Sequence, residues 1–315
     1  MSKKKKVPQI VKDIKAFKQH EINYAFQKNI SYSQFSMFTE CPKKWSLQYK
    51  EGFKVFSSTI HTTFGSALHE ALQHYLNVMY DVSTVKADEL DLEEYFEEQL
   101  RNEYKKQYKA NKNQHFSSPT ELREFYDDGV AIIRDFKKNK SKHFSKRGWW
   151  LVGCEIPISL NPKPQYKNVI YQGFLDIVMY HEPTNTFKII DIKTSTSGWR
   201  KKEKDDEIKQ FQLILYKKFF AEQFNLDVKD IEIEFFIVKR KLYESEDFVI
   251  KRIQKFSPPS GKTKQNRVTL ALNKFISEAF GDGEYKEADH LPTINDKCKW
   301  CIYNETHLCP ATFKP

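Results

Sequence analysis

The chain has 315 residues, of which 39% are hydrophobic and 15% aromatic, so it can bury a sizeable core. Its net charge of +10 and mean hydropathy of −0.69 favour a soluble protein with a polyanionic partner such as nucleic acid. There is no run of about 18 apolar residues and no secretory signal pattern, so we expect a cytoplasmic protein that does not cross a membrane.

The N-terminal half is predicted to be helical. The four lysines at 3–6 are expected to form a solvated tail, followed by a helix over 8–28. Ser31 and Ser33 are candidate N-caps for the aromatic-rich segment that comes next. Three further segments have apolar residues at the 3–4 spacing typical of amphipathic helices. These segments cover 61–80, 88–110 and 119–139.

The pattern changes at Trp149, where β-branched and aromatic runs of strand length begin. The predicted strands cover 149–160, 168–181, 186–194, 231–240 and 247–256. Helical spacing returns over 205–224 and 263–280. We therefore expect an α/β protein with a central mixed β-sheet flanked by helices, a helical N-terminal elaboration and a cysteine-bearing tail. The expected parts are 1–29 (tail and helix), 30–148 (helical part), 149–280 (core) and 281–315 (cysteine cluster).

Two acidic residues and a lysine lie on adjoining predicted strands. Asp176 is in the middle of one strand, and Asp191 and Lys193 share one face of the next because side chains i and i+2 point to the same side. Charges on a largely apolar strand are costly unless they are paired or bind a metal, so they indicate either an ordinary ion pair or a metal centre. Two carboxylates can hold Mg²⁺ together with phosphate and water, and a lysine can stabilise the developing charge.

Three other side chains could belong to the same site. Gln212 and Tyr216 lie on one face of the predicted helix 205–224, directly after the strand that carries Asp191. His69 lies one turn after Gly65 among apolar neighbours, where a histidine is either a core residue or a metal ligand.

Taken in chain order, these candidates resemble the motif set of the PD-(D/E)xK nuclease superfamily, and most closely its RecB-like branch. The motif residues are His69, Asp176, Asp191, Ile192, Lys193, Gln212 and Tyr216. A serine-rich helix start followed by Cys41 and Pro42 also resembles that branch, so the similarity spans about 30–309. The sequence departs from the pattern in having no proline before Asp176 and in having aspartate rather than glutamate at 191.

The resemblance implies a restriction-endonuclease-like core and metal-dependent hydrolysis of DNA phosphodiesters. It implies that Mg²⁺ or Mn²⁺ is bound by His69, Asp176, Asp191 and the carbonyl of Ile192. Lys193 would act on the water, and Gln212 and Tyr216 would support the site or contact DNA. Glu155, on the preceding strand, is a further candidate acid, and its alternative interpretation is a strand-surface carboxylate.

Three cysteines near the C-terminus have the spacing of metal ligands. Cys298, Cys301 and Cys309 form a C-x2-C-x7-C pattern, and a C-x2-C loop points both thiolates at one centre. Cys41 as fourth ligand would give the four thiolates of a [4Fe–4S] cluster, whereas His307 would give a Cys₃His zinc site. The remaining Cys154 is expected to be a small buried hydrophobe.

The resemblance favours the iron–sulfur alternative. The RecB-like branch includes CRISPR adaptation nucleases and AddB-type helicase-nucleases, which have one cysteine near the start and three near the end of the domain. It implies a structural cluster that joins Cys41 to the C-terminal cysteines and clasps the two ends of the chain.

Two functions are compatible with these patterns. One is an exonuclease that acts on DNA ends or single strands in replication, recombination or repair. The other is a non-catalytic nucleic-acid-binding module with a zinc or iron–sulfur structural site. The full set of Asp176, Asp191 and Lys193 favours the enzyme, because a binding module has no need of it. No P-loop is present, so any helicase or recombination partner would be a separate protein.

Overall fold

A computed structural model of the chain describes residues 6–19, 21–53, 55–56, 58–243, 250–281 and 283–310. Most of the predicted lysine tail and residues 247–249 of the last predicted strand lie outside this part. Within it, no helix has both the length and the apolar character needed to cross a membrane.

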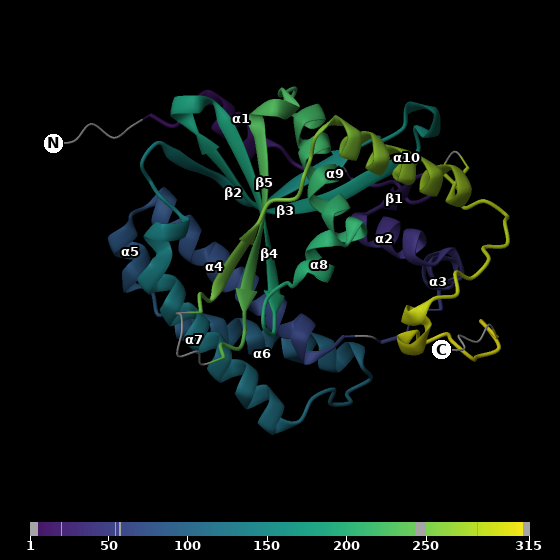
Figure 1. The fold of residues 1–315 in the computed structure, drawn as a ribbon, viewed down its shortest axis with the longest axis horizontal. Helices are drawn as coiled ribbons and strands as arrows, with labels where there is room; N and C mark the ends of the chain where they lie inside the picture. Colours follow the sequence, from purple (N-terminus) through teal and green to yellow (C-terminus); the bar gives the residue numbers. More distant parts are fainter. Residues whose placement is uncertain are drawn as a thin grey trace.

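A six-stranded mixed sheet forms the centre of the molecule (Figure 1). The strands are β1 (Lys28–Ile30), β2 (Trp149–Leu160), β3 (Val169–His181), β4 (Thr186–Ser195), β5 (Ile231–Lys239) and β6 (Ile253–Phe256). Their order is β1-β3-β4-β5-β6. Strand β2 pairs with the edge of β3 that faces away from β1 and β4. The pairs β1–β3 and β4–β5 are parallel and the others antiparallel, which confirms the predicted mixed sheet.

Helices cover both faces of this sheet (Figure 1). One face is covered by α1 (Gln9–Ala16), α2 (Tyr32–Glu40), α9 (Glu207–Gln223) and α10 (Lys262–Ala279). The other face is covered by α4 (Ile60–Asp81), α6 (Leu92–Ala110) and α7 (Pro119–His143). The short helices are α3 (Pro42–Trp45), the π-helical turn η1 (Ser46–Lys50), α5 (Thr84–Glu89), α8 (Lys201–Asp205), and the 3₁₀ turns η2 (Pro164–Tyr166), η3 (Glu182–Thr184), η4 (Val228–Asp230) and η5 (Asp296–Trp300).

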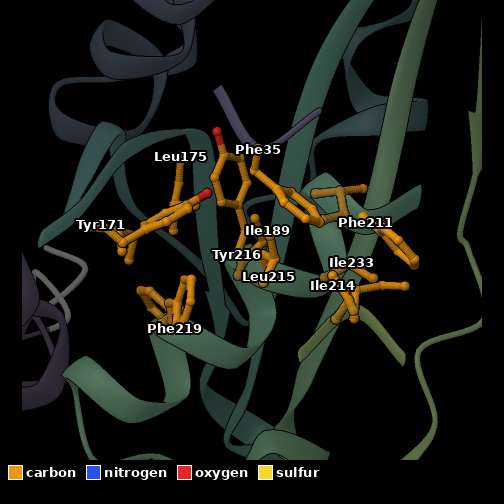
Figure 2. Packing of buried hydrophobic residues seen from close by; sticks show 14 of the residues in the cluster. Phe35, Tyr171, Leu175, Ile189, Phe211, Ile214, Leu215, Tyr216, Phe219 and Ile233 are labelled. Atoms are coloured by element: carbon orange, nitrogen blue, oxygen red, sulfur yellow. The ribbon is translucent and has the colours of Figure 1, made fainter. Parts of the chain in front are cut away.

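The alternation of side chains along the strands divides the core into two layers. Ile189 of β4 packs in the layer under α9, which Figure 2 shows from close by together with Phe35 and Phe211. Ile190 and Ile192 of the same strand pack in the layer under α4. The result is a three-layer α/β/α arrangement, in which both faces of the sheet are buried.

The predicted helix over 8–28 is wrong beyond residue 16. Phe17 has extended backbone and packs edge-on against Phe224 at 5.4 Å, which ends α1. Residues 28–30 then form strand β1, parallel to the start of β3. A three-residue strand has no periodicity of its own, and its partner lies about 140 residues further along the chain.

Two other predicted helices differ at their ends. The segment 88–110 is interrupted at Leu90, which has extended backbone, and α6 begins afresh after Asp91. The Asp91 side chain accepts a hydrogen bond from the backbone N–H of Glu94 and so caps the new helix. The helix predicted over 119–139 continues to His143.

A glycine in α7 allows close contact with α6, which gives a test of the packing of the helical layer. A Cβ atom added at Gly129 would lie 2.3 Å from the ring of Phe96. We expect Gly129→Ala to lower the free energy of unfolding by about 1–3 kcal/mol, because overpacking outweighs the gain in helix propensity. Urea denaturation measures the change. Gly261→Ala, at the N-cap of α10, where no atom lies within 4 Å of the added Cβ, should lower the free energy of unfolding by less than about 1 kcal/mol, the cost of the poorer cap alone.

Candidate active site

Strands β3 and β4 separate at the predicted site. Their last pair on this side is Ile177 with Ile190, and the next residues along each strand are Asp176 and Asp191. The Asp176 Oδ2 atom accepts a hydrogen bond of 2.7 Å from the backbone N–H of Ile192. The Asp176 side chain thus takes the place of a backbone hydrogen bond between β3 and β4. Both carboxylates lie where the two strands diverge.

Asp191 is buried beside its lysine. Its exposed fraction is 1%, and the Lys193 Nζ atom lies 2.8 Å from its Oδ2 atom. Among the described residues no hydrogen bond of good geometry reaches that Oδ2 atom, so the ion pair is its compensation for burial. Burial raises the pKa of Asp191 in spite of the lysine. For Lys193, burial acts to lower the pKa, but Asp191 and Asp176 outweigh it and the pKa is raised, which keeps the ammonium charged.

Asp176 has less favourable surroundings. Burial raises its pKa well above the usual range, and the negative charge of Asp191 adds to the effect. Lys193 and the N–H of Ile192 act in the opposite direction without cancelling it. One buried and one largely buried carboxylate beside a single ammonium form a negatively charged site that a further cation would stabilise.

Helix α4 brings His69 to the same place. A Cβ atom at Gly65 would lie 3.3 Å from the Thr194 side chain, so glycine lets the helix lie close against β4 one turn before His69. The His69 Nδ1 atom lies 3.5 Å from Asp176 Oδ2. Burial and the charge of Lys193 lower the pKa of His69 to about 4, against the opposite effect of a hydrogen bond to the backbone of Ile192. The imidazole is therefore neutral at pH 7, the form that binds metals.

The predicted Gln212–Tyr216 pair approaches from α9. Gln212 Nε2 donates a hydrogen bond of 3.3 Å to the Tyr216 hydroxyl. Gly173 of β3 has no side chain, which makes room for the Tyr216 ring of α9. A Cβ atom added at Gly173 would lie 3.3 Å from that ring. Burial raises the pKa of Tyr216, with smaller contributions from the charges of Asp191 and Asp176, so its hydroxyl stays protonated near the carboxylates. Figure 2 shows the hydroxyl of Tyr171 pointing toward Tyr216.

Two residues near the site were missed in the sequence. Gln73 of α4 is 4% exposed and bonds both to Glu155 and to the backbone of Asp176. Tyr32 of α2 lies close enough to Asp191 for that charge to act on its pKa, which burial raises, and its hydroxyl donates to the carbonyl of Ile208 at 2.8 Å. The signal for Gln73 was its place four residues after His69, on the same face of α4.

A hard divalent cation fits these donors. In the described part of the chain, no three His, Cys, Asp or Glu side chains are grouped closely enough to hold a metal ion as they stand. However, the buried Asp191 Oδ2 atom has only the Lys193 ammonium as a close partner among the described residues. Asp176 lies near enough for the charge of Asp191 to act on it, and the Nδ1 atom of the neutral His69 lies 3.5 Å from Asp176 Oδ2. Oxygen donors supplemented by an imidazole suit Mg²⁺ or Mn²⁺.

The four predicted cysteine ligands come from opposite ends of the sequence and lie around one small pocket. Cys41, Cys298, Cys301 and Cys309 all line it. The N–H of Thr293 donates to Cys41 Sγ at 3.4 Å, and the N–H of Asn295 donates to Cys298 Sγ at 3.5 Å. His307, the alternative ligand, has an exposed side chain. Cys154 lies elsewhere, partly buried on β2, with its thiol 3.9 Å from the carbonyl of Gln73.

The fold agrees with that of one protein family. The sequence profile of the PD-(D/E)XK nuclease superfamily matches residues 29–310, which include β2 to β6, most of β1, both carboxylates and the four cysteines of the pocket. No curated protein matches the chain. Since the profile covers nearly the whole chain, the chain belongs to the PD-(D/E)XK nuclease superfamily.

Proposed function

We propose that this protein is a metal-dependent deoxyribonuclease of the RecB-like branch, acting as an exonuclease on DNA ends or single strands. The observation that supports this most is the buried Asp191 carboxylate, which faces Lys193 at the point where β3 and β4 separate. A binding module would gain nothing from two neighbouring carboxylates that are buried or largely buried, because such like charges reduce stability unless a ligand compensates them.

Each residue has a role in this proposal. The cation would be held by His69, Asp176, Asp191 and the Ile192 carbonyl. When bound, it would supply Lewis-acid charge to the phosphate and the attacking water. Lys193 keeps its proton and orients that water or stabilises charge on the phosphate.

The remaining candidates surround that centre. Tyr216, held by Gln212, offers a protonated hydroxyl beside the carboxylates to support the site or contact the strand. Glu155 is exposed and contributes to raising the pKa of Asp176, so it lies close enough to act as an additional acid. The net charge of +10 favours a polyanionic substrate.

End-labelled single- and double-stranded DNA, incubated with Mg²⁺, Mn²⁺ or a chelator, tests the proposal. We expect cleavage only with a divalent cation, and release of short products from an end. Lys193→Ala should reduce the rate by about 10²–10³-fold, the usual effect of removing one group that stabilises the transition state. Cleavage that survives chelation, or that is unaffected in Lys193→Ala, would contradict the assignment. Cleavage of a circular single strand, which has no end, would show that the enzyme is an endonuclease and not an exonuclease.

We also propose that the cysteine pocket holds a [4Fe–4S] cluster. Four thiolates match the ligand set of such clusters, and backbone N–H groups that donate to sulfur stabilise thiolates. A zinc ion held by the same four cysteines is the second candidate, since zinc also accepts four thiolates. With either metal the site would have a structural role, because it would join the helical part 30–148, which contains Cys41, to the tail 281–315.

A further inference from the structure

The alternation of side chains breaks at the same level of two neighbouring strands, β2 and β3. On β2, Cys154 packs in the layer under α4, whereas Ile156 packs in the layer under α9. The same change occurs on β3 between Ile177 and Leu175, which pair with these two residues. In a regular strand, residues i and i+2 share a face, so both strands are kinked at the residues between.

Glu155 and Asp176 occupy the two kinked positions. Glu155 has φ of 53°, in the left-handed region, which a residue with a side chain adopts at a cost of about 1 kcal/mol or more. Neither residue belongs to the paired register of β2 and β3, although the pairs on both sides of them are formed. Left-handed backbone inside a strand persists only where surrounding contacts hold it, and such positions gather at functional sites.

Gln73 makes the contacts at this kink. Its Nε2 atom donates to the Glu155 Oε1 atom at 2.7 Å and to the backbone carbonyl of Asp176 at 2.9 Å. The side chain is 4% exposed and projects from α4 one turn after His69. A single buried amide thus uses both of its hydrogens on the two kinked strands, one on a backbone group and one on a side chain.

We propose that Gln73 is a positioning residue that holds the kink and thereby presents the Asp176 and Glu155 carboxylates to the same cation. This inference rests on the proposed metal-dependent function. Without the amide, the Asp176 carbonyl loses its buried partner and Glu155 loses the contact that fixes its direction. The backbone of Asp176 would then be less firmly placed relative to Asp191, and the exposed Glu155 side chain would no longer be directed toward the cation.

The test measures cation binding in the absence of DNA. Mn²⁺ is titrated while the melting temperature is followed, for wild type, Gln73→Met, Glu155→Gln and the double variant. Methionine keeps the size of glutamine and removes its donor. We expect each single change to weaken the apparent Mn²⁺ affinity by about 10-fold or more, the usual effect of losing a group that orients a ligand. We expect the double variant to lose less than the two single losses combined, because Glu155 contributes to cation binding only while Gln73 directs its carboxylate.

A second readout uses the metal-free protein. Amide hydrogen exchange of peptides covering 151–160 and 172–181 should become faster in Gln73→Met, because the kink is no longer held. Gln223→Met is the matched control: Gln223 also bonds to the backbone of β2, at Pro157 and Ser159, but at a distance from the carboxylates. It should lose stability without changing the Mn²⁺ affinity.

Two results would overturn the proposal. One is a Mn²⁺ affinity equal to that of wild type in either Gln73→Met or Glu155→Gln. Because Glu155 is exposed, Glu155→Gln should fold and give this result even if Gln73→Met does not fold. The other is full additivity of the two changes. If wild type binds Mn²⁺ and the pair is coupled but no DNA is cleaved, the inference on Gln73 stands and the nuclease assignment fails.

Discussion

Asp176→Asn should abolish cleavage and at the same time stabilise the metal-free protein. The cation supplies several kcal/mol of charge stabilisation, and about 1.4 kcal/mol corresponds to a tenfold change in rate, so we expect a loss of at least about 10³-fold. Asn retains an oxygen that can accept the 2.7 Å hydrogen bond from Ile192. It removes a negative charge that burial and Asp191 make unfavourable. The melting temperature without metal should therefore rise by about 2–4 °C, which corresponds to roughly 1 kcal/mol.

Cleavage rates and melting curves with and without Mn²⁺ check both parts of this expectation. In wild type, Mn²⁺ should raise the melting temperature, because a ligand that binds only the folded state stabilises it. In Asp176→Asn that rise should be small or absent. An unchanged rate would remove Asp176 from the site, and a lower melting temperature without metal would show that its charge is not a source of strain.

Cys41→Ser should remove the bound metal and lower the stability of the whole chain. Cys41 follows α2, and the other three cysteines of the pocket are more than 250 residues further along. A site that joins such distant segments contributes its binding free energy to folding, so losing one of four ligands should cost several kcal/mol. We expect a fall in melting temperature of about 10 °C and the loss of iron from protein purified without oxygen.

Elemental analysis and absorption near 400 nm measure the metal, and Cys154→Ser is the control. Cys154 is a cysteine outside the pocket, so its replacement should leave the metal content unchanged. Stoichiometric zinc in a colourless wild-type protein would show that the cysteine pocket binds zinc and not an iron–sulfur cluster. Metal content that is unaffected in Cys41→Ser would exclude Cys41 as a ligand.

Strong local patterns made much of the fold predictable from the sequence. The strand 149–160 was predicted with the bounds of β2, and the helix 61–80 with those of α4 to within one residue at each end. Both segments are long and have a clear period. The i, i+2 rule also placed Asp191 and Lys193 on one face, where their charged atoms lie 2.8 Å apart.

What the sequence did not reveal depends on tertiary contacts. Strand β1 exists because it pairs with the start of β3, and nothing in its three residues favours a strand over a helix. The kink at Glu155 and Asp176 likewise requires a contact between α4 and two strands. Gln73 therefore escaped attention, since a glutamine on an amphipathic helix resembles a solvated residue until its burial is known.

The proposed metal-dependent nuclease centre depends most on Asp191. The most direct measurement is the rate at which wild type and Asp191→Ala cleave an end-labelled single strand in saturating Mn²⁺, with both proteins shown to be folded by circular dichroism. We predict cation-dependent cleavage by wild type and a rate at least about 10³-fold lower for Asp191→Ala. Equal rates for the two proteins would contradict the proposed centre.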